Sequence, residues 1–341
     1  MAFREIIGQS RAIELIKSYY REKRPHHSYL FLGPRGVGKT TCALNFAKLL
    51  NCENPLPDAE PCDTCRSCEA IDGGYHPDVQ LVTLPNEKRE LGIEEIRQVR
   101  QSAYTSAAWG SWKVYIVEKA EVLTREASDA LLKILEEPPE RCLFILLAPN
   151  IADVSPTIAS RCHIINFLPA KKEEIASFLE KRHHIDRELA FTFASLAEGR
   201  PGFAITLASD EKMRTVREEI FSFLLELEID MDYSLRAGQE FVKIANQLRE
   251  GEERDKIQQC LLFSSSFFRD LLLLRLSGDE SLLINYDKRN KLKEVVNKYS
   301  LDFLNAALNA LQRTYRLLQP GSNVNHRLAL EVMFMDILGG R

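Results

Sequence analysis

The feature that most constrains this chain is a glycine-rich run of eight residues near its N-terminus. The run reads Gly33, Pro34, Arg35, Gly36, Val37, Gly38, Lys39 and Thr40, and it matches G-x-x-x-x-G-K-[ST] at every defined position. Glycines in this pattern permit backbone conformations that are closed to residues with a Cβ, so that successive N–H groups can point at phosphate oxygens. The run therefore predicts a phosphate-binding loop.

Individual residues of the loop have separate predicted tasks. Lys39 supplies positive charge to the terminal phosphates of a nucleotide, and the Thr40 hydroxyl is suited to coordinate Mg²⁺. Pro34 has no backbone N–H, so the donors are expected from Arg35 onward. We also include the next residue, Thr41, among the predicted nucleotide contacts. A helix that begins near Lys39 would aim its positive end at the same phosphates.

The segments around the loop alternate between strand-like and helix-like patterns. Short apolar runs predict buried strands at 28–32, 79–83, 114–117, 143–148 and 163–167. Helical spacing of apolar residues falls between them, at 39–50, 93–103 and 124–136. Strands that alternate with helices are typical of a mainly parallel α/β sheet with helices on both faces.

The character of the chain changes after Pro169. Helical patterns follow at 171–181 and 187–197, the segment 199–202 then breaks the chain, and the pattern is helical almost throughout from about residue 211. We therefore predict an α/β domain over 1–168, a small helical domain over 169–210 and a helical bundle over 211–341.

Composition and charge limit the classes of function. The chain has 341 residues, 45% hydrophobic and 28% charged, with a formal net charge of −4, which is the balance of an ordinary globular protein. The net charge is negative, and there are no dense Lys/Arg clusters near residues 52–68. Both observations argue against a zinc-dependent DNA-binding module. The N-terminus lacks the apolar segment of a signal peptide, and no run approaches a membrane span. We expect a cytoplasmic protein that does not contact membranes.

Four of the eight cysteines fall in one short segment. They are Cys52, Cys62, Cys65 and Cys68, the last three in a double C-x-x-C step. Four thiolates on one loop are enough to complete a tetrahedral Zn²⁺ site with no open position, so such a site would be structural rather than catalytic. We predict a zinc module over about 51–70, and a redox or disulfide cluster is the alternative.

These features together resemble the AAA+ subunits of the bacterial DNA polymerase III clamp loader. The shared motifs are the phosphate loop, the cysteine cluster soon after its helix, Ile7-Gly8-Gln9, the run Ala130-Leu131-Leu132-Lys133-Ile134-Leu135-Glu136-Glu137-Pro138-Pro139, and Ser160-Arg161-Cys162. The resemblance is specific over 1–170 and weaker over 171–341, where mainly the helical character agrees. It implies a RecA-like domain with a zinc insertion, a small lid domain and a helical collar that oligomerises with other loader subunits.

Two subunit types share these motifs, the motor ATPase (γ/τ) and the δ′ subunit, and the acidic pair after the third strand favours δ′. A motor subunit has Asp-Glu where this chain has Glu118 and Lys119. Glu118 could still bind Mg²⁺ with Thr40, but the Lys119 ammonium has no acceptor with which to orient an attacking water. Glu121 or a displaced Glu118 is the alternative source of that carboxylate. The sequence leaves open whether Lys119 pairs with Glu118 or with Glu121.

Two further departures fall where motor subunits sense the nucleotide. Motor subunits have Thr-Thr after the strand at 143–148; here Ala148 and Pro149 stand there, and only Asn150, one position late, could replace the sensor. Motor subunits also have a G-S-x-R pattern whose arginine reaches back to the nucleotide. The aligned residue here is Gly202, and Arg200 lies two positions earlier. The resemblance therefore implies a δ′-type subunit that holds a nucleotide but hydrolyses it poorly.

The resemblance also implies a role for Arg161. In the family, the S-R-C arginine is presented across the subunit interface to the neighbour's ATP, where a guanidinium neutralises charge on the transferred phosphoryl group. A solvated arginine at a helix end is the alternative. The implied partners are the motor (γ/τ) and δ subunits, the sliding clamp and, through the complex, primed DNA. Other interpretations are an active γ/τ-type ATPase, a non-replicative nucleotide switch and a zinc-dependent DNA-binding module.

Overall fold

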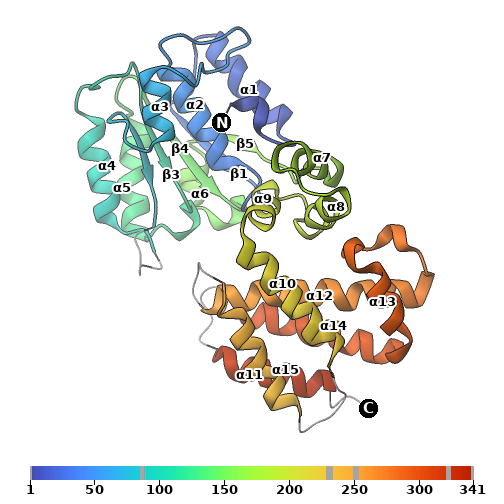
Figure 1. Ribbon diagram of the computed structural model, residues 1–341. Helices are drawn as coiled ribbons and strands as arrows, with labels where there is room; N and C mark the ends of the chain where they lie inside the picture. The colour runs from blue at the N-terminus through green and yellow to red at the C-terminus, as the bar shows by residue number, and fades with distance from the viewer. Residues whose placement is uncertain are drawn as a thin grey trace. The chain divides into compact units, whose positions relative to one another are not determined.

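The chain divides into two compact units in a computed structural model that describes residues 2–84, 88, 90–227, 233–248, 253–319 and 324–338. One unit is Met1–Glu174 with Gly199–Gly202, and the other is Ile175–Glu198 with Phe203–Arg341. The first contains the sheet and the second is helical (Figure 1). Residues of the predicted lid domain fall in both units, and the division into three domains stays a prediction.

Five parallel strands form the sheet of the first unit. They are β1 (Ser28–Leu32), β2 (Val79–Val82), β3 (Lys113–Val117), β4 (Cys142–Ala148) and β5 (His163–Asn166). They lie in the order β2-β3-β4-β1-β5, and every pair is parallel. The predicted parallel sheet is confirmed, with each strand within one residue of its expected bounds. β1, β3 and β4 are buried along their whole length, which explains their apolar runs without alternation.

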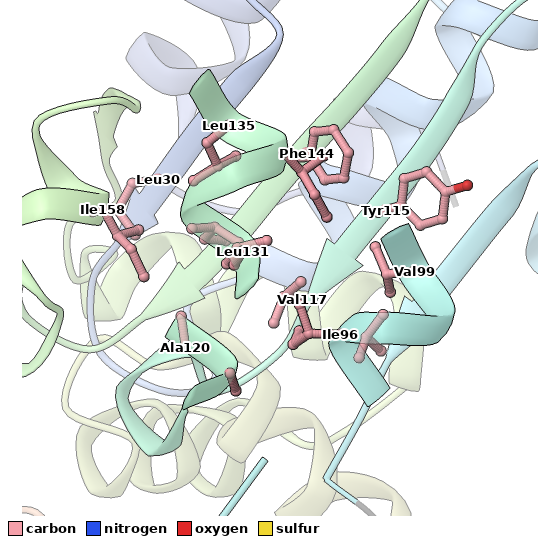
Figure 2. Packing of buried hydrophobic residues seen from close by; sticks show 14 of the residues in the cluster. Leu30, Ile96, Val99, Tyr115, Val117, Ala120, Leu131, Leu135, Phe144 and Ile158 are labelled. Carbon is pink, nitrogen blue, oxygen red and sulfur yellow. The ribbon is translucent and has the colours of Figure 1, made fainter. Parts of the chain in front are cut away.

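Helices cover both faces of this sheet. They are α1 (Ser10–Arg21), α2 (Lys39–Asn51), α3 (Arg66–Asp72), α4 (Ile93–Ala103), α5 (Arg125–Glu136) and α6 (Pro156–Ala159). Successive side chains of a strand point to opposite faces. On one face, Leu30, Tyr115 and Phe144 pack against α4, α5 and α6 (Figure 2). On the other face, neighbouring strand residues such as Phe31 and Ile116 pack against α1 and α2.

The second unit is built from helices that pack side by side. The helices after β5 are α7 (Lys172–His183), α8 (Arg187–Leu196), α9 (Pro201–Ser209), α10 (Glu211–Leu225), α11 (Tyr233–Ala245), α12 (Glu253–Ser277), α13 (Arg289–Val295), α14 (Leu301–Leu317) and α15 (His326–Leu338). α12 packs against α10, α11 and α14, and α15 packs against α11 and α14. The predicted helical C-terminal region is confirmed. No helix among the described residues is long and apolar enough to span a membrane.

The predicted break between helices at 199–202 is wrong for its last two residues. α9 begins at Pro201, so Pro201 and Gly202 form its first turn. Proline suits the first helical position because its fixed φ matches the helix and its missing N–H has no partner there in any helix. The helix therefore begins inside the segment that its composition marks as a break.

Candidate functional site

The phosphate loop runs from the end of β1 to the start of α2. The Gly33 N–H donates to the Ala148 carbonyl of β4 at 3.2 Å. A Cβ at Gly33 would lie 2.2 Å from the Phe167 carbonyl oxygen, so any other residue would clash with the backbone. Gly38, at φ 102°, precedes α2 in a left-handed conformation that glycine adopts without strain. These glycines allow the sharp loop that the sequence predicts.

The Lys39 side chain is folded back onto the loop. Its ammonium donates to the Gly33 carbonyl and, at 3.0 Å, to the Pro34 carbonyl. Burial lowers the pKa of Lys39 to about 8, although the carboxylates of Glu121 and Glu118 oppose that shift. The ammonium is thus placed in the loop, held by carbonyl oxygens with which a phosphate would compete.

The two predicted Mg²⁺ ligands lie against each other. The Thr40 hydroxyl donates to Glu118 Oε1 at 2.8 Å. Thr40 stands in the first turn of α2, and Glu118 directly follows β3. A hydroxyl and a carboxylate are oxygen ligands of the kind that Mg²⁺ takes in phosphate sites. This pair could therefore hold the ion at the mouth of the loop.

Lys119 pairs with neither of the two glutamates that the sequence offered. Lys119 is exposed, with a left-handed backbone at φ 55°, and its side chain forms no ion pair with a described residue. Glu121 instead accepts from Arg35 of the loop at 3.1 Å. The second oxygen of Glu121, Oε2, is buried and has no hydrogen-bond partner among the described residues. A carboxylate therefore lies beside the loop, three residues after Glu118.

The two sensor positions differ in their contact with the loop. Asn150, the predicted substitute sensor, is exposed and donates to Asp153 at 3.2 Å. Gly202 contacts the loop through its backbone, because its N–H donates to the Gly36 carbonyl at 2.8 Å. A Cβ at Gly202 would lie 3.1 Å from that carbonyl oxygen. The sequence does not indicate this backbone contact between Gly202 and Gly36, although position 202 aligns with an arginine that reaches the nucleotide in motor subunits.

Arg161 lies on the surface between α6 and β5. Its guanidinium donates to the Thr157 carbonyl at 3.0 Å and to Glu136 Oε1 at 2.5 Å. Its backbone is fixed separately, since its carbonyl accepts from the Ser28 hydroxyl at 2.7 Å. Glu136 is the last residue of α5 and belongs to the run that carries the family resemblance. The structure thus joins two motifs that lie 25 residues apart.

The four clustered cysteines converge. The Sγ atoms of Cys52, Cys62, Cys65 and Cys68 all lie within 4.8 Å of one another. Sulfurs around a tetrahedral Zn²⁺ with 2.3 Å bonds are about 3.8 Å apart, so this cluster needs only a small contraction to hold an ion. The Cys62 N–H donates to Cys52 Sγ and the Cys65 N–H to Cys62 Sγ, both at 3.3 Å. None of the eight cysteines is in a disulfide.

The thiol of Cys62 is the one most ready to ionise. Burial acts to raise the pKa of Cys62, but hydrogen bonds from the backbone N–H groups of Thr64 and Cys65 and from neighbouring thiols outweigh it and lower the pKa to about 6. A thiolate is the form that binds metal. Four sulfur donors in a tetrahedral arrangement suit Zn²⁺ or an iron–sulfur centre.

A five-stranded parallel sheet in the order β2-β3-β4-β1-β5, with this loop between β1 and α2, is the arrangement of a P-loop nucleotide-binding domain. Two family descriptions match the chain: "DNA polymerase III, delta subunit" over residues 8–171 and "DNA polymerase III, delta subunit, C terminal" over residues 236–338. These two matches support a relationship of the chain to the DNA polymerase III clamp-loader family.

Curated relatives match about half of the chain. DNA polymerase III subunit tau of Bacillus subtilis is 36% identical over 179 residues, which are 52% of this chain and 31% of that protein. Subunit gamma of Buchnera aphidicola from Acyrthosiphon pisum is 37% identical over 178 residues, 52% of this chain and 48% of that protein. The chain thus spans less than half the length of these relatives.

Solved structures include a gamma subunit-related protein of Thermotoga maritima. It is 20% identical, with a TM-score of 0.44, and the match covers 96% of this chain and 98% of that one. The RuvB Holliday junction branch migration motor of Thermotoga maritima is 14% identical, with a TM-score of 0.43, covering 86% of this chain and 88% of that one.

Proposed function

We propose that this chain is a δ′-type subunit of the clamp loader, which holds a nucleotide without hydrolysing it and supplies Arg161 to the ATP of a neighbouring motor subunit. The observation that carries the proposal is Lys119. An ammonium, which has no acceptor, follows Glu118 where hydrolysis needs a water-orienting carboxylate. The exposed Asn150 and the absence of a side chain at Gly202 add to this argument.

The phosphate loop supports the binding half of the proposal. The proposed nucleotide contacts are Gly33, Pro34, Arg35, Gly36, Val37, Gly38, Lys39, Thr40 and Thr41. On binding, the Lys39 ammonium would exchange its two carbonyl partners for phosphate oxygens. Thr40 and Glu118 are the proposed ligands of Mg²⁺.

Nucleotide affinity should depend on pH through Lys39. Its pKa is about 8 in the free chain, and the phosphates favour the protonated form, so bound Lys39 keeps its proton to higher pH. Binding above pH 8 then requires proton uptake, and the affinity for ADP should fall by up to about tenfold per pH unit between pH 8 and 10. Titration calorimetry at pH 7, 8, 9 and 10 measures this. An affinity that stays constant across that range would contradict it.

The surface position of Arg161 supports the trans role. Its side chain is 36% exposed and its partner Glu136 is 49% exposed. Exposed ion pairs contribute about 0.2–1 kcal/mol, so a phosphate group on an adjacent subunit can displace Glu136 at little cost. The guanidinium is therefore available to a neighbour while it is kept in place in the free chain.

An exposed apolar stripe on α15 supports assembly. Leu328, Val332 and Met335 are 58%, 44% and 40% exposed and stand four and three residues apart, on one face of the helix. Clustered exposed apolar side chains are typical of interaction sites. We propose the motor (γ/τ) and δ subunits as partners through the collar, with the sliding clamp and primed DNA reached through the complex. We also propose Zn²⁺ as the structural ion of Cys52, Cys62, Cys65 and Cys68.

Steady-state hydrolysis by the purified chain tests this proposal. We expect ATP to bind but phosphate release to stay at the level of the protein-free blank. The competing candidate, an active γ/τ-type ATPase, is favoured by the 36% identity to subunit tau and by the carboxylate of Glu121 beside the loop. Robust turnover that is lost in Glu121→Gln would establish that candidate and contradict ours.

A further inference from the structure

A buried lysine lies between the P-loop helix and the cysteine cluster. Lys48 of α2 has a fully buried side chain, and its ammonium donates to Asp63 Oδ1 at 2.9 Å and to Asp72 Oδ2 at 2.5 Å. Lysine is almost never fully buried unless it is paired, because removing its charge from water is costly. The cost of burying the Lys48 charge is therefore offset by its two ion pairs, so the position of this side chain depends on both carboxylates.

Both carboxylates stand on the segments that carry the cysteines. Asp63 lies between Cys62 and Cys65, and Asp72 ends α3, the helix that contains Cys68. Lys48 itself stands four residues before Cys52, at the end of α2. The Lys48 ammonium thus links the end of α2, which leads to Cys52, to two other segments: the turn that holds Cys62 and Cys65, and α3, which holds Cys68.

The Lys48 ammonium also lies in a module that carries several negative charges. Four thiolates around a divalent ion carry a net charge of about −2. Asp63 and Asp72 add two negative charges to the same module. Without the Lys48 ammonium, Asp63 and Asp72 would lose the positive charge that they share.

We propose that Lys48 is a positioning residue for the metal centre: it holds the Asp63 turn and α3 against α2, so that the thiols of Cys62, Cys65 and Cys68 converge on Cys52. This inference rests on the proposed metal site. It adds to that proposal a residue outside the ligand set, on the same helix as the phosphate loop. Groups that orient ligands without touching the ion commonly change metal affinity when they are removed, and Lys48 would act in this way through Asp63 and Asp72 rather than by bonding a thiol.

The experiment measures zinc affinity of the full chain by competition with a chromogenic chelator, using Zn²⁺ as the only probe. Lys48→Met removes the charge and keeps the length, and it should weaken zinc binding by about 10–100-fold. Asp72→Asn, at a half-exposed partner, should weaken it by a smaller factor because Asp63 remains. Lys17→Met is the matched control, since Lys17 pairs with Glu60 at 2.5 Å but Glu60 lies outside both C-x-x-C steps.

A purely structural lysine would give a different result. In that case Lys48→Met and Asp72→Asn would lower the melting temperature equally with and without zinc and leave zinc affinity at the wild-type value, which would overturn the proposal. If Lys48→Met does not fold, Asp72→Asn alone decides, because unchanged zinc affinity in that variant contradicts the proposed clamp. A wild-type chain that binds no zinc would contradict the metal centre itself, and the Lys48 proposal with it.

Discussion

A loader reconstituted with Arg161→Ala should lose ATP hydrolysis at the site that receives this arginine, by about 10³- to 10⁵-fold. In the proposed trans role the guanidinium stabilises charge on the transferred phosphoryl group, and alanine would leave that charge uncompensated. The variant should fold and assemble, because the Arg161 carbonyl and N–H keep their bonds to Ser28 and Ile158. The measurement is single-turnover hydrolysis in the assembled complex with clamp and primed DNA.

The matched control for this prediction is Arg125→Ala, an exposed arginine at the start of α5. It removes the same charge from the same unit and should leave turnover at the wild-type rate. Glu136→Gln is informative as well, since it removes the ion pair with Arg161 but keeps the arginine and its hydrogen bond to the Thr157 carbonyl. If Arg161→Ala turns over as fast as wild type in an intact complex, the trans role is wrong.

Loss of the metal should remove the fold of the cysteine segment. Binding of structural zinc is worth about 10–16 kcal/mol in zinc-finger peptides, as much as the whole stability of an ordinary domain. Cys68 is fully buried, so Cys68→Ser removes a ligand that solvent cannot replace. We expect this variant to purify without zinc and to show rapid hydrogen exchange over residues 52–72, whereas β1, β3 and β4 stay protected.

Cys162→Ser is the control for this second prediction, because Cys162 is a half-buried cysteine outside the cluster. It should retain one zinc per chain and wild-type exchange. Chelation of the wild-type protein should reproduce the exchange pattern of Cys68→Ser. Protection of residues 52–72 that survives complete removal of zinc would show that the segment folds without an ion.

The sheet could be predicted from the sequence because burial leaves a local pattern. β4, which is buried along its whole length, consists of apolar residues alone, and a segment between strands such as α5 has helical spacing. Helix ends were close to their predicted positions: the helix predicted at 124–136 is α5, which begins one residue later because the Thr124 side chain accepts from the Ala127 N–H as an N-cap. α9 was missed because a glycine and proline pair usually marks a turn.

The candidate sites were predictable where spacing along the chain carries the chemistry. The phosphate loop and the double C-x-x-C step place their groups within a few residues. The pairing of Thr40 with Glu118, 78 residues apart, was predicted instead from the family resemblance. Other contacts between residues far apart in the chain leave no pattern of spacing in the sequence. Lys48 pairs with residues 15 and 24 positions away, and nothing in its own neighbourhood in the sequence indicates burial.

One comparison tests directly whether this chain combines a nucleotide site that does not hydrolyse with an arginine that acts on a neighbouring subunit. The loader is reconstituted with the wild-type chain, with Lys39→Ala or with Arg161→Ala, and ATP hydrolysis is measured with clamp and primed DNA. We predict that Lys39→Ala abolishes nucleotide binding by this chain but leaves loader turnover intact, whereas Arg161→Ala removes hydrolysis at the neighbouring site. The opposite outcome, with turnover lost in Lys39→Ala and kept in Arg161→Ala, would contradict the proposed roles of both residues.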